Sequence, residues 1–234
     1  MDHSERIASE YLSSRGFRDI VYEPDGNVSP DFLINGCVAV EVRRLNQNED
    51  TADGPRGLEE TALPLQAKIS RLLGDLGSSD GGDSWYVVYS FRRPLLPWQE
   101  LADALRLELG LFRHDPEHQS TTRNIAKGFR VRLLRAGRRC PDFFVAGGYT
   151  DGDSGGFVLS ELDRNIRICV AEKTKKIAPV REKYPYWWLL LVDHIAFGLS
   201  DSDREHLRQL LQLDPSWDKI IVVNSLEPTQ GYEL

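Results

Sequence analysis

Two acidic residues and one cation lie close together in an apolar stretch of this chain. Asp31 follows Pro30 at the start of "PDFLI", and Glu41 lies inside "CVAVEVRRL", with Arg43 two positions later. Because side chains at positions i and i+2 of a strand share a face, Glu41 and Arg43 are expected to project together. An unpaired carboxylate in a buried strand is costly, so a metal ion or an ion pair is expected to compensate it.

The Asn35-Gly36 pair between these two segments predicts a hairpin with a type I′ turn. With that turn, Asp31 falls opposite residues near 40 and 41, so the two carboxylates meet at one edge of a site. Hydrolysis of a phosphodiester with Mg²⁺ needs a few rigidly held oxygen ligands and a cation near the scissile phosphate. Asp31 and Glu41 are therefore the candidate ligands for Mg²⁺ or Mn²⁺.

Two predicted helices carry further candidates for the site. Residues 4–15 have the apolar spacing of an amphipathic helix, and Glu5 falls on its core-facing stripe. A second helix is expected at about 62–76. Its residues Gln66 and Lys68 border the apolar stripe from opposite sides, so either side chain can reach inward.

The order of these elements resembles the PD-(D/E)XK nuclease superfamily. The pattern E-x-x-A-x-x-Y-L-x-x-x-G-F from Glu5 is followed by "PD", "VEVR", a helix with a glutamine and a strand, most like the small resolvase-like bacterial members. That resemblance implies a restriction-endonuclease-like αβββαβ core over about residues 1–92. It also implies Mg²⁺-dependent cleavage of DNA, with Asp31 and Glu41 as metal ligands, Glu5 as a supporting acid and Gln66 in the site.

Arg43 stands where the family motif has a lysine. The pKa of arginine, above about 12, bars it from proton transfer, although it can stabilise charge on a phosphate. Two interpretations follow. Arg43 is a working electrostatic substitute, with Lys68 as a candidate for a migrated ammonium. Alternatively, the site has lost catalysis and the fold serves as a nucleic-acid-binding or assembly protein. A plain ion pair between Glu41 and Arg43 is a third explanation.

The net charge of −7 conceals a strongly basic segment. Residues 123–139 hold seven basic residues and no acid, and residues 172–183 hold five basic residues against two acidic ones. Local charge decides where a phosphate backbone binds, so the first segment is the candidate surface for DNA or another nucleic acid. A solvated face, or a surface that contacts only protein, is the alternative explanation. The candidate binding residues are Arg123, Lys127, Arg130, Arg132 and Arg135.

The order of predicted helices and strands favours one α/β domain over residues 1–234. In it a nuclease-like core (1–92) with a mixed sheet flanked by helices is extended by further α/β units (93–234). No apolar run reaches the roughly 18 residues of a membrane span. Three scattered cysteines and a polar N-terminus indicate a cytoplasmic protein with reduced thiols. The oligomeric state is left open, and a homodimer is one of the options.

Overall fold

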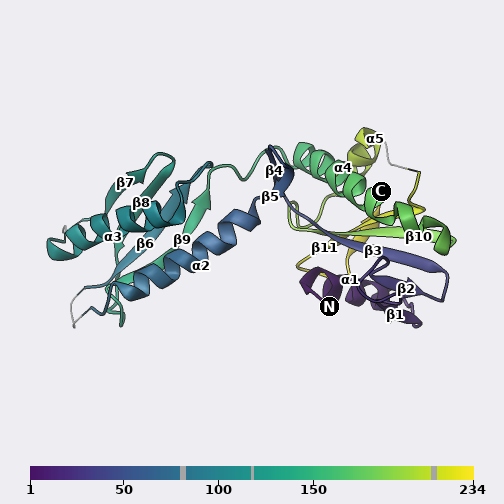
Figure 1. Cartoon of the computed structure of the whole chain (residues 1–234), viewed down its shortest axis with the longest axis horizontal. Helices are drawn as coiled ribbons and strands as arrows, with labels where there is room; N and C mark the ends of the chain where they lie inside the picture. The colour runs from purple at the N-terminus through teal and green to yellow at the C-terminus, as the bar shows by residue number, and fades with distance from the viewer. Residues whose placement is uncertain (80–82, 117–118, 212–214) are drawn as a thin grey trace. The chain divides into compact units, whose positions relative to one another are not determined.

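The chain divides into two compact units (Figure 1). Unit 1 comprises residues 1–57 and 156–234, and unit 2 comprises residues 58–155. The structure is a computed structural model, and it describes residues 1–79, 83–116, 119–211 and 215–234. Both units combine a mixed sheet with helices, so the expected α/β class is confirmed.

Unit 1 contains a six-stranded sheet in the order β1-β2-β3-β10-β11-β12. The first three strands form an antiparallel meander, and β3, β10 and β11 run parallel to one another. The last strand is antiparallel to β11. The strands are β1 (Ile20–Tyr22), β2 (Phe32–Ile34), β3 (Val38–Leu45), β10 (Tyr186–Asp193), β11 (Lys219–Asn224) and β12 (Gly231–Glu233).

Helices cover both faces of this sheet. Alternate residues of β3 point to opposite sides, so Val40 and Val42 pack with α1 (His3–Ser14), whereas Ala39 and Leu45 pack with α4 (Val158–Ile177). On the α4 side lie also the 3₁₀ helix η1 (Ala178–Lys183) and α5 (Asp201–Leu210), each with residues in or against the same apolar cluster. A hairpin of β4 (Asn48–Thr51) and β5 (Gly54–Gly57) follows β3.

Unit 2 contains a four-stranded sheet in the order β7-β8-β6-β9. Its two helices, α2 and α3, contribute their apolar stripes to one cluster with alternate residues of the strands. The elements are α2 (Glu59–Asp75), β6 (Trp85–Phe91), α3 (Trp98–His114), β7 (Thr121–Ala126), β8 (Phe129–Arg135) and β9 (Phe144–Asp151).

The division into units differs from the expected core over residues 1–92. The expected helix and strand after β3 do form, as α2 and β6, but they pack in unit 2. The helix that packs on β3 opposite α1 is α4, and the strand that pairs with β3 in parallel is β10. An amphipathic helix shows only that it must bury a stripe. It does not show on which sheet, so the sequence order alone could not identify these partners.

No helix in the described ranges is long and apolar enough to cross a membrane.

Candidate functional site

Asp31 and Glu41 face each other across the hairpin of β2 and β3, within the expected range of residues 40 and 41, although residues 35–37 and not the expected Asn35-Gly36 pair alone connect the strands. Asn35 and Gly36 both have positive φ, and Phe32 pairs with Val40 in the antiparallel register, so the next pair along is Asp31 and Glu41. The backbone N–H of Val42 donates to Asp31 Oδ2 at 2.7 Å. This bond fixes the Asp31 carboxylate beside β3.

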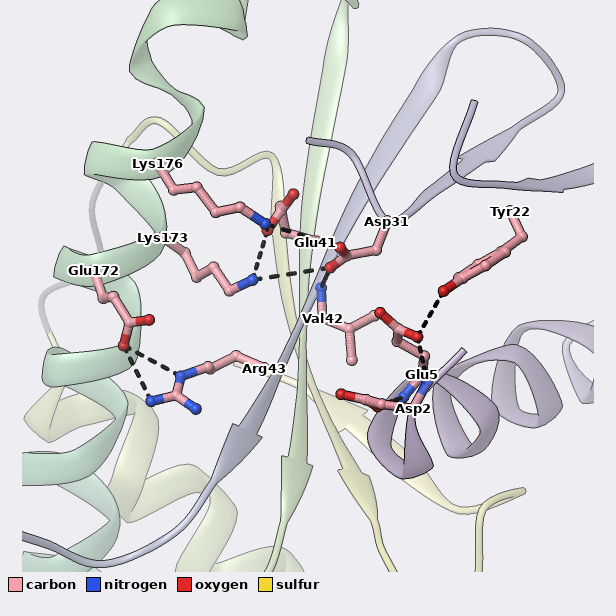
Figure 2. A network of polar contacts seen from close by, with 10 residues as sticks. All are labelled: Asp2, Glu5, Tyr22, Asp31, Glu41, Val42, Arg43, Glu172, Lys173 and Lys176. Carbon is pink, nitrogen blue, oxygen red and sulfur yellow. Dashed lines mark hydrogen bonds and ion pairs between the residues drawn. The ribbon is translucent and has the colours of Figure 1, made fainter. Parts of the chain in front are cut away.

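Two lysines of α4 join the two carboxylates (Figure 2). Lys173 Nζ lies 2.6 Å from Glu41 Oε2 and 3.8 Å from Asp31 Oδ2. Lys176 Nζ lies 3.0 Å from Glu41 Oε2 and 3.9 Å from Asp31 Oδ1. Residues three apart lie on the same helix face, so both ammonium groups reach the hairpin together. The carboxylates do share a cation, and in this structure each shared cation is an ammonium.

Because the cluster is largely buried, the charge state of each of its four ionisable groups depends on the charges of the other three. The side chain of Glu41 is 0% exposed and that of Lys173 is 9% exposed, whereas Lys176 is 45% exposed. Burial raises the pKa of Glu41, but the charge and hydrogen bond of Lys173, together with hydrogen bonds from Ser29 and Lys176, outweigh burial, and the net pKa is lowered. For Asp31, burial and then the Glu41 charge raise the pKa, although Lys173 opposes them. The cluster therefore shifts the pKa values of the two carboxyl groups in opposite directions, down for Glu41 and up for Asp31.

The same carboxylates fit the chemistry of Mg²⁺ binding. Among the described residues, Glu41 Oε1 is a buried oxygen that neither lysine contacts, so it is an unused donor that a metal ion would reach only if the cluster rearranged. Mg²⁺ is usually held by one or two carboxylates together with water and substrate phosphates. The described part of the chain contains no group of three or more His, Cys, Asp or Glu residues suited to a metal. Among the described residues, Asp31 and Glu41 would be the only protein ligands of the metal ion.

Arg43 shares the face of Glu41 but contacts a different partner. Its Nε donates to Glu172 Oε2 at 3.2 Å, and both side chains are partly exposed. The shared face is as expected from the strand period. The suggested ion pair between Glu41 and Arg43 is not what the structure contains, because Glu41 pairs with the lysines of α4 and Arg43 pairs with Glu172.

Glu5 is engaged at the start of α1. Its backbone N–H donates to Asp2 Oδ1 at 2.8 Å, its Oε2 accepts from the Asp2 N–H, and the Tyr22 hydroxyl donates to the same oxygen at 2.9 Å. Figure 2 shows Glu5 on the α1 side of β3, whereas the lysines lie on the α4 side. The Glu5 carboxylate therefore caps the N-terminus of α1, as part of a capping box with Asp2. The expected three-acid cluster is therefore reduced to Asp31 and Glu41 in the contacts described.

Gln66 and Lys68 lie on α2, in unit 2, and both side chains are exposed. Lys68 Nζ lies 5.6 Å from the centre of the Trp98 ring, a contact within unit 2. Their expected role in the site rested on the assumption that helix 62–76 packs beside β3. In the structure α4 does so, and the ammonium groups that reach Glu41 are those of Lys173 and Lys176.

The basic stretch 123–139 is split by strand alternation. Arg130 and Arg132 project from one face of β8. Arg123 pairs with Val131, which points to the helix-covered face. Arg135 forms an ion pair with Asp83 at 2.6 Å, and Lys127 lies exposed in the β7–β8 turn.

Sequence reasoning missed Lys173 and Lys176 as site residues, although it noted the basic cluster that contains them. A signal was present. The buried stripe of α4 runs through Ile166, Val170 and Ile177, and Lys173 falls on the same stripe at helical spacing. A lysine at such a position requires a buried counter-charge, and Glu41 was an acid expected in a buried strand.

No family model, no curated protein and no solved structure matches this chain. Function must therefore be inferred from the residues themselves. The distinctive arrangement is a buried carboxylate opposite a second carboxylate, with two helix-borne ammonium groups within reach of both.

Proposed function

We propose that unit 1 is a nuclease core of the restriction-endonuclease-like type that hydrolyses phosphodiester bonds of DNA with Mg²⁺. The observation that carries the proposal is the placement of Asp31 opposite Glu41, with Lys173 in contact with both. The element order also supports it. An N-terminal helix precedes an antiparallel three-stranded meander, and α4 then leads into β10, which is parallel to β3.

The chain's own residues have distinct roles in this proposal. Lys173 is buried against Glu41 and keeps that carboxylate ionised at neutral pH. Lys176 is the more exposed ammonium, and its contacts with Glu41 raise its pKa in spite of burial. It therefore remains charged and can donate to a phosphate oxygen as water attacks the phosphorus and the bond to the leaving oxygen breaks.

Asp31 and Glu41 would hold the metal ion. When bound, Mg²⁺ supplies a Lewis acid for the scissile phosphate and lowers the pKa of an attacking water. The Oε1 of Glu41 and the partly exposed Asp31 carboxylate are hard oxygen donors, as this ion prefers.

Single-turnover cleavage of plasmid and branched DNA, with Mg²⁺ or Mn²⁺, tests the proposal. Wild-type protein is expected to cut, and both Glu41→Gln and Asp31→Asn are expected to lose about a hundredfold or more in rate. Mn²⁺ binding, followed by its paramagnetic resonance signal, gives a second readout and should weaken in both variants. Cleavage that survives Glu41→Gln would place the reaction elsewhere in the chain.

A specific observation favours a second candidate, a catalytically degenerate fold that binds nucleic acid. Two carboxylates already face two ammonium groups, so the cluster is electrically balanced without a metal ion. For this candidate, wild-type protein binds DNA without cutting it, and Mn²⁺ produces no signal that depends on Glu41.

A further inference from the structure

The sheet of unit 2 has one face covered by helices and one that no helix of unit 2 covers in the described residues. The covered face supplies a continuous buried cluster with α2 and α3. Alternate residues of the same strands point the other way and are partly or fully exposed. On β6 and β8 these residues are Tyr86, Val88, Ser90, Arg130, Arg132 and Leu134.

A polar row crosses all four strands on the uncovered face. The register places Asn124 beside Arg130, Arg130 beside Ser90, and Ser90 beside Thr150. The Nε of Arg130 donates to Ser90 Oγ at 2.9 Å, which orients the guanidinium. This row lies along a pocket of about 380 Å³ whose lining includes Arg92, Gly128 and Gly152 in addition to the four residues.

Two glycines hold Arg92 at the end of this pocket. A Cβ atom on Gly152 would lie 2.7 Å from Arg92 Cγ, and one on Gly128 would lie 3.0 Å from the Arg92 carbonyl oxygen. The backbone N–H of Arg92 donates to the Gly128 carbonyl at 2.8 Å. Glycine at both positions allows the chain to approach Arg92 this closely, so the backbone of Arg92 and the inner part of its side chain are placed at the end of the pocket.

The described lining of the pocket carries positive charge, and two acids of the same segment are engaged by Arg93. Arg93 donates to both carboxylate oxygens of Asp151, at 2.8 Å each, and to Asp153 at 3.2 Å. No acidic residue is among those described as lining the pocket, whereas Arg92 and Arg130 are. Arg132, one row further along β8, extends the positive charge beyond the pocket.

We infer that this pocket binds a phosphate group of a nucleic-acid backbone through Arg92 and Arg130, with hydrogen bonds from Ser90, Asn124 and Thr150. Guanidinium groups match phosphate oxygens in geometry and charge. An open sheet face with further positive charge suits a chain of phosphates. A single small anion would be bound better in an enclosed site. The inference rests on the proposed function for its choice of nucleic acid.

Binding of a short fluorescent DNA by the full chain in EDTA, measured by anisotropy at several salt concentrations, tests this inference. The double variant Arg92→Gln/Arg130→Gln is expected to bind about tenfold more weakly or worse. The slope of log affinity against log salt should also fall by one to two, since about one counterion is released per phosphate contact. The matched control Arg71→Gln/Arg106→Gln removes two exposed arginines of α2 and α3 and should leave both quantities unchanged. Thermal unfolding confirms that each variant is folded.

An unchanged affinity and slope in the Arg92/Arg130 variant would overturn the inference, as would an equal loss in the control. Tight binding to anionic lipid vesicles, with no binding to DNA, would also overturn it. Cleavage assays over a range of DNA concentrations separate the two proposals. Glu41→Gln should bind DNA in EDTA as tightly as wild type and cut poorly, whereas Arg92→Gln/Arg130→Gln should need more DNA to reach the same cleavage rate. A wild-type protein that never cuts, but loses DNA binding in the pocket variant, refutes the nuclease proposal and leaves the binding pocket supported.

Discussion

Lys173 Nζ lies 2.6 Å from Glu41 Oε2, although 132 positions of sequence separate the two residues. Neither side chain has appreciable contact with solvent. The ammonium of α4 therefore compensates the carboxylate of β3, and both the packing of α4 and the ionisation of Glu41 depend on this contact. Four predictions follow from this cluster and its surroundings.

Removing one partner of the buried pair should cost more stability than removing both. Glu41→Gln preserves the shape of the side chain and leaves Lys173 without its nearest counter-charge, so the free energy of unfolding should fall by about 3 kcal/mol. Urea denaturation measures it. The exposed Glu182→Gln serves as a control and should change stability by about 0.5 kcal/mol or less.

The double variant Glu41→Gln/Lys173→Met completes the cycle. The single variant Lys173→Met is measured as well. Because the double variant removes both charges, it should lose less stability than the sum of the losses in Glu41→Gln and Lys173→Met. Strict additivity would show that the two residues do not interact in solution.

Lys176, and not Arg43, should carry the charge stabilisation during cleavage. Lys176→Met is expected to slow single-turnover cleavage about a hundredfold, as the loss of one preorganised donor does. Arg43→Gln breaks only a partly exposed pair with Glu172 and should cost less than about tenfold. Lys175→Met, on the exposed side of α4, is the control. A larger loss of rate in Arg43→Gln than in Lys176→Met would contradict this prediction and support Arg43 as the catalytic cation, as the sequence motif suggests.

Acidification should affect Glu41 and Asp31 in opposite directions. The folded pKa of Glu41 lies below its ordinary value of 4.5, so its contribution to stability is present above pH 4.5 and is lost as pH falls through the folded value. The folded pKa of Asp31 lies above 3.8, so its ionisation destabilises the fold as pH rises from 3.8 through the folded value.

Urea denaturation of wild type, Glu41→Gln and Asp31→Asn at several acidic pH values measures this difference. The advantage of wild type over Glu41→Gln should shrink below pH 4.5. Relative to Asp31→Asn, wild type should gain stability as pH falls towards 3.8. Parallel curves for the two variants would contradict the assignment of pKa directions.

Cys169 should report on the packing of α4. Burial raises the pKa of its thiol to about 11, and the residue lies in the apolar cluster between α4 and the sheet. At mildly alkaline pH, Cys37 and Cys140, which are partly exposed, should react with a thiol reagent first. Cys169 should react only as the protein unfolds in urea. Fast labelling of Cys169 in native protein would show that α4 opens readily.

Local features of the fold could be derived from the sequence alone. Asn35-Gly36 marked the hairpin and brought Asp31 close to residues 40 and 41. A two-residue turn would have paired Asp31 with Val40, but Cys37 also belongs to the connection, so Ile34 pairs with Val38 and Asp31 falls opposite Glu41. The strand period placed Glu41 and Arg43 on one face. These relationships involve residues close in sequence, where backbone geometry leaves few alternatives.

The partners of these residues came only from the tertiary structure. The chain leaves unit 1 after β5, forms unit 2, and returns at α4, so the helix next in sequence is not the helix next in space. Both α2 and α4 have an apolar stripe, so the local sequence does not show which of them packs on β3. Which stripe covers β3 is decided by long-range packing. The sequence by itself determined the two carboxylates and the hairpin that brings them together, whereas the pairing of Asp31 with Glu41 and not Val40 came from the three-residue connection 35–37. That Lys173 and Lys176 neutralise them, in place of Lys68 or Arg43, was decided by the burial of α4 against the sheet, which places both ammonium groups beside Glu41.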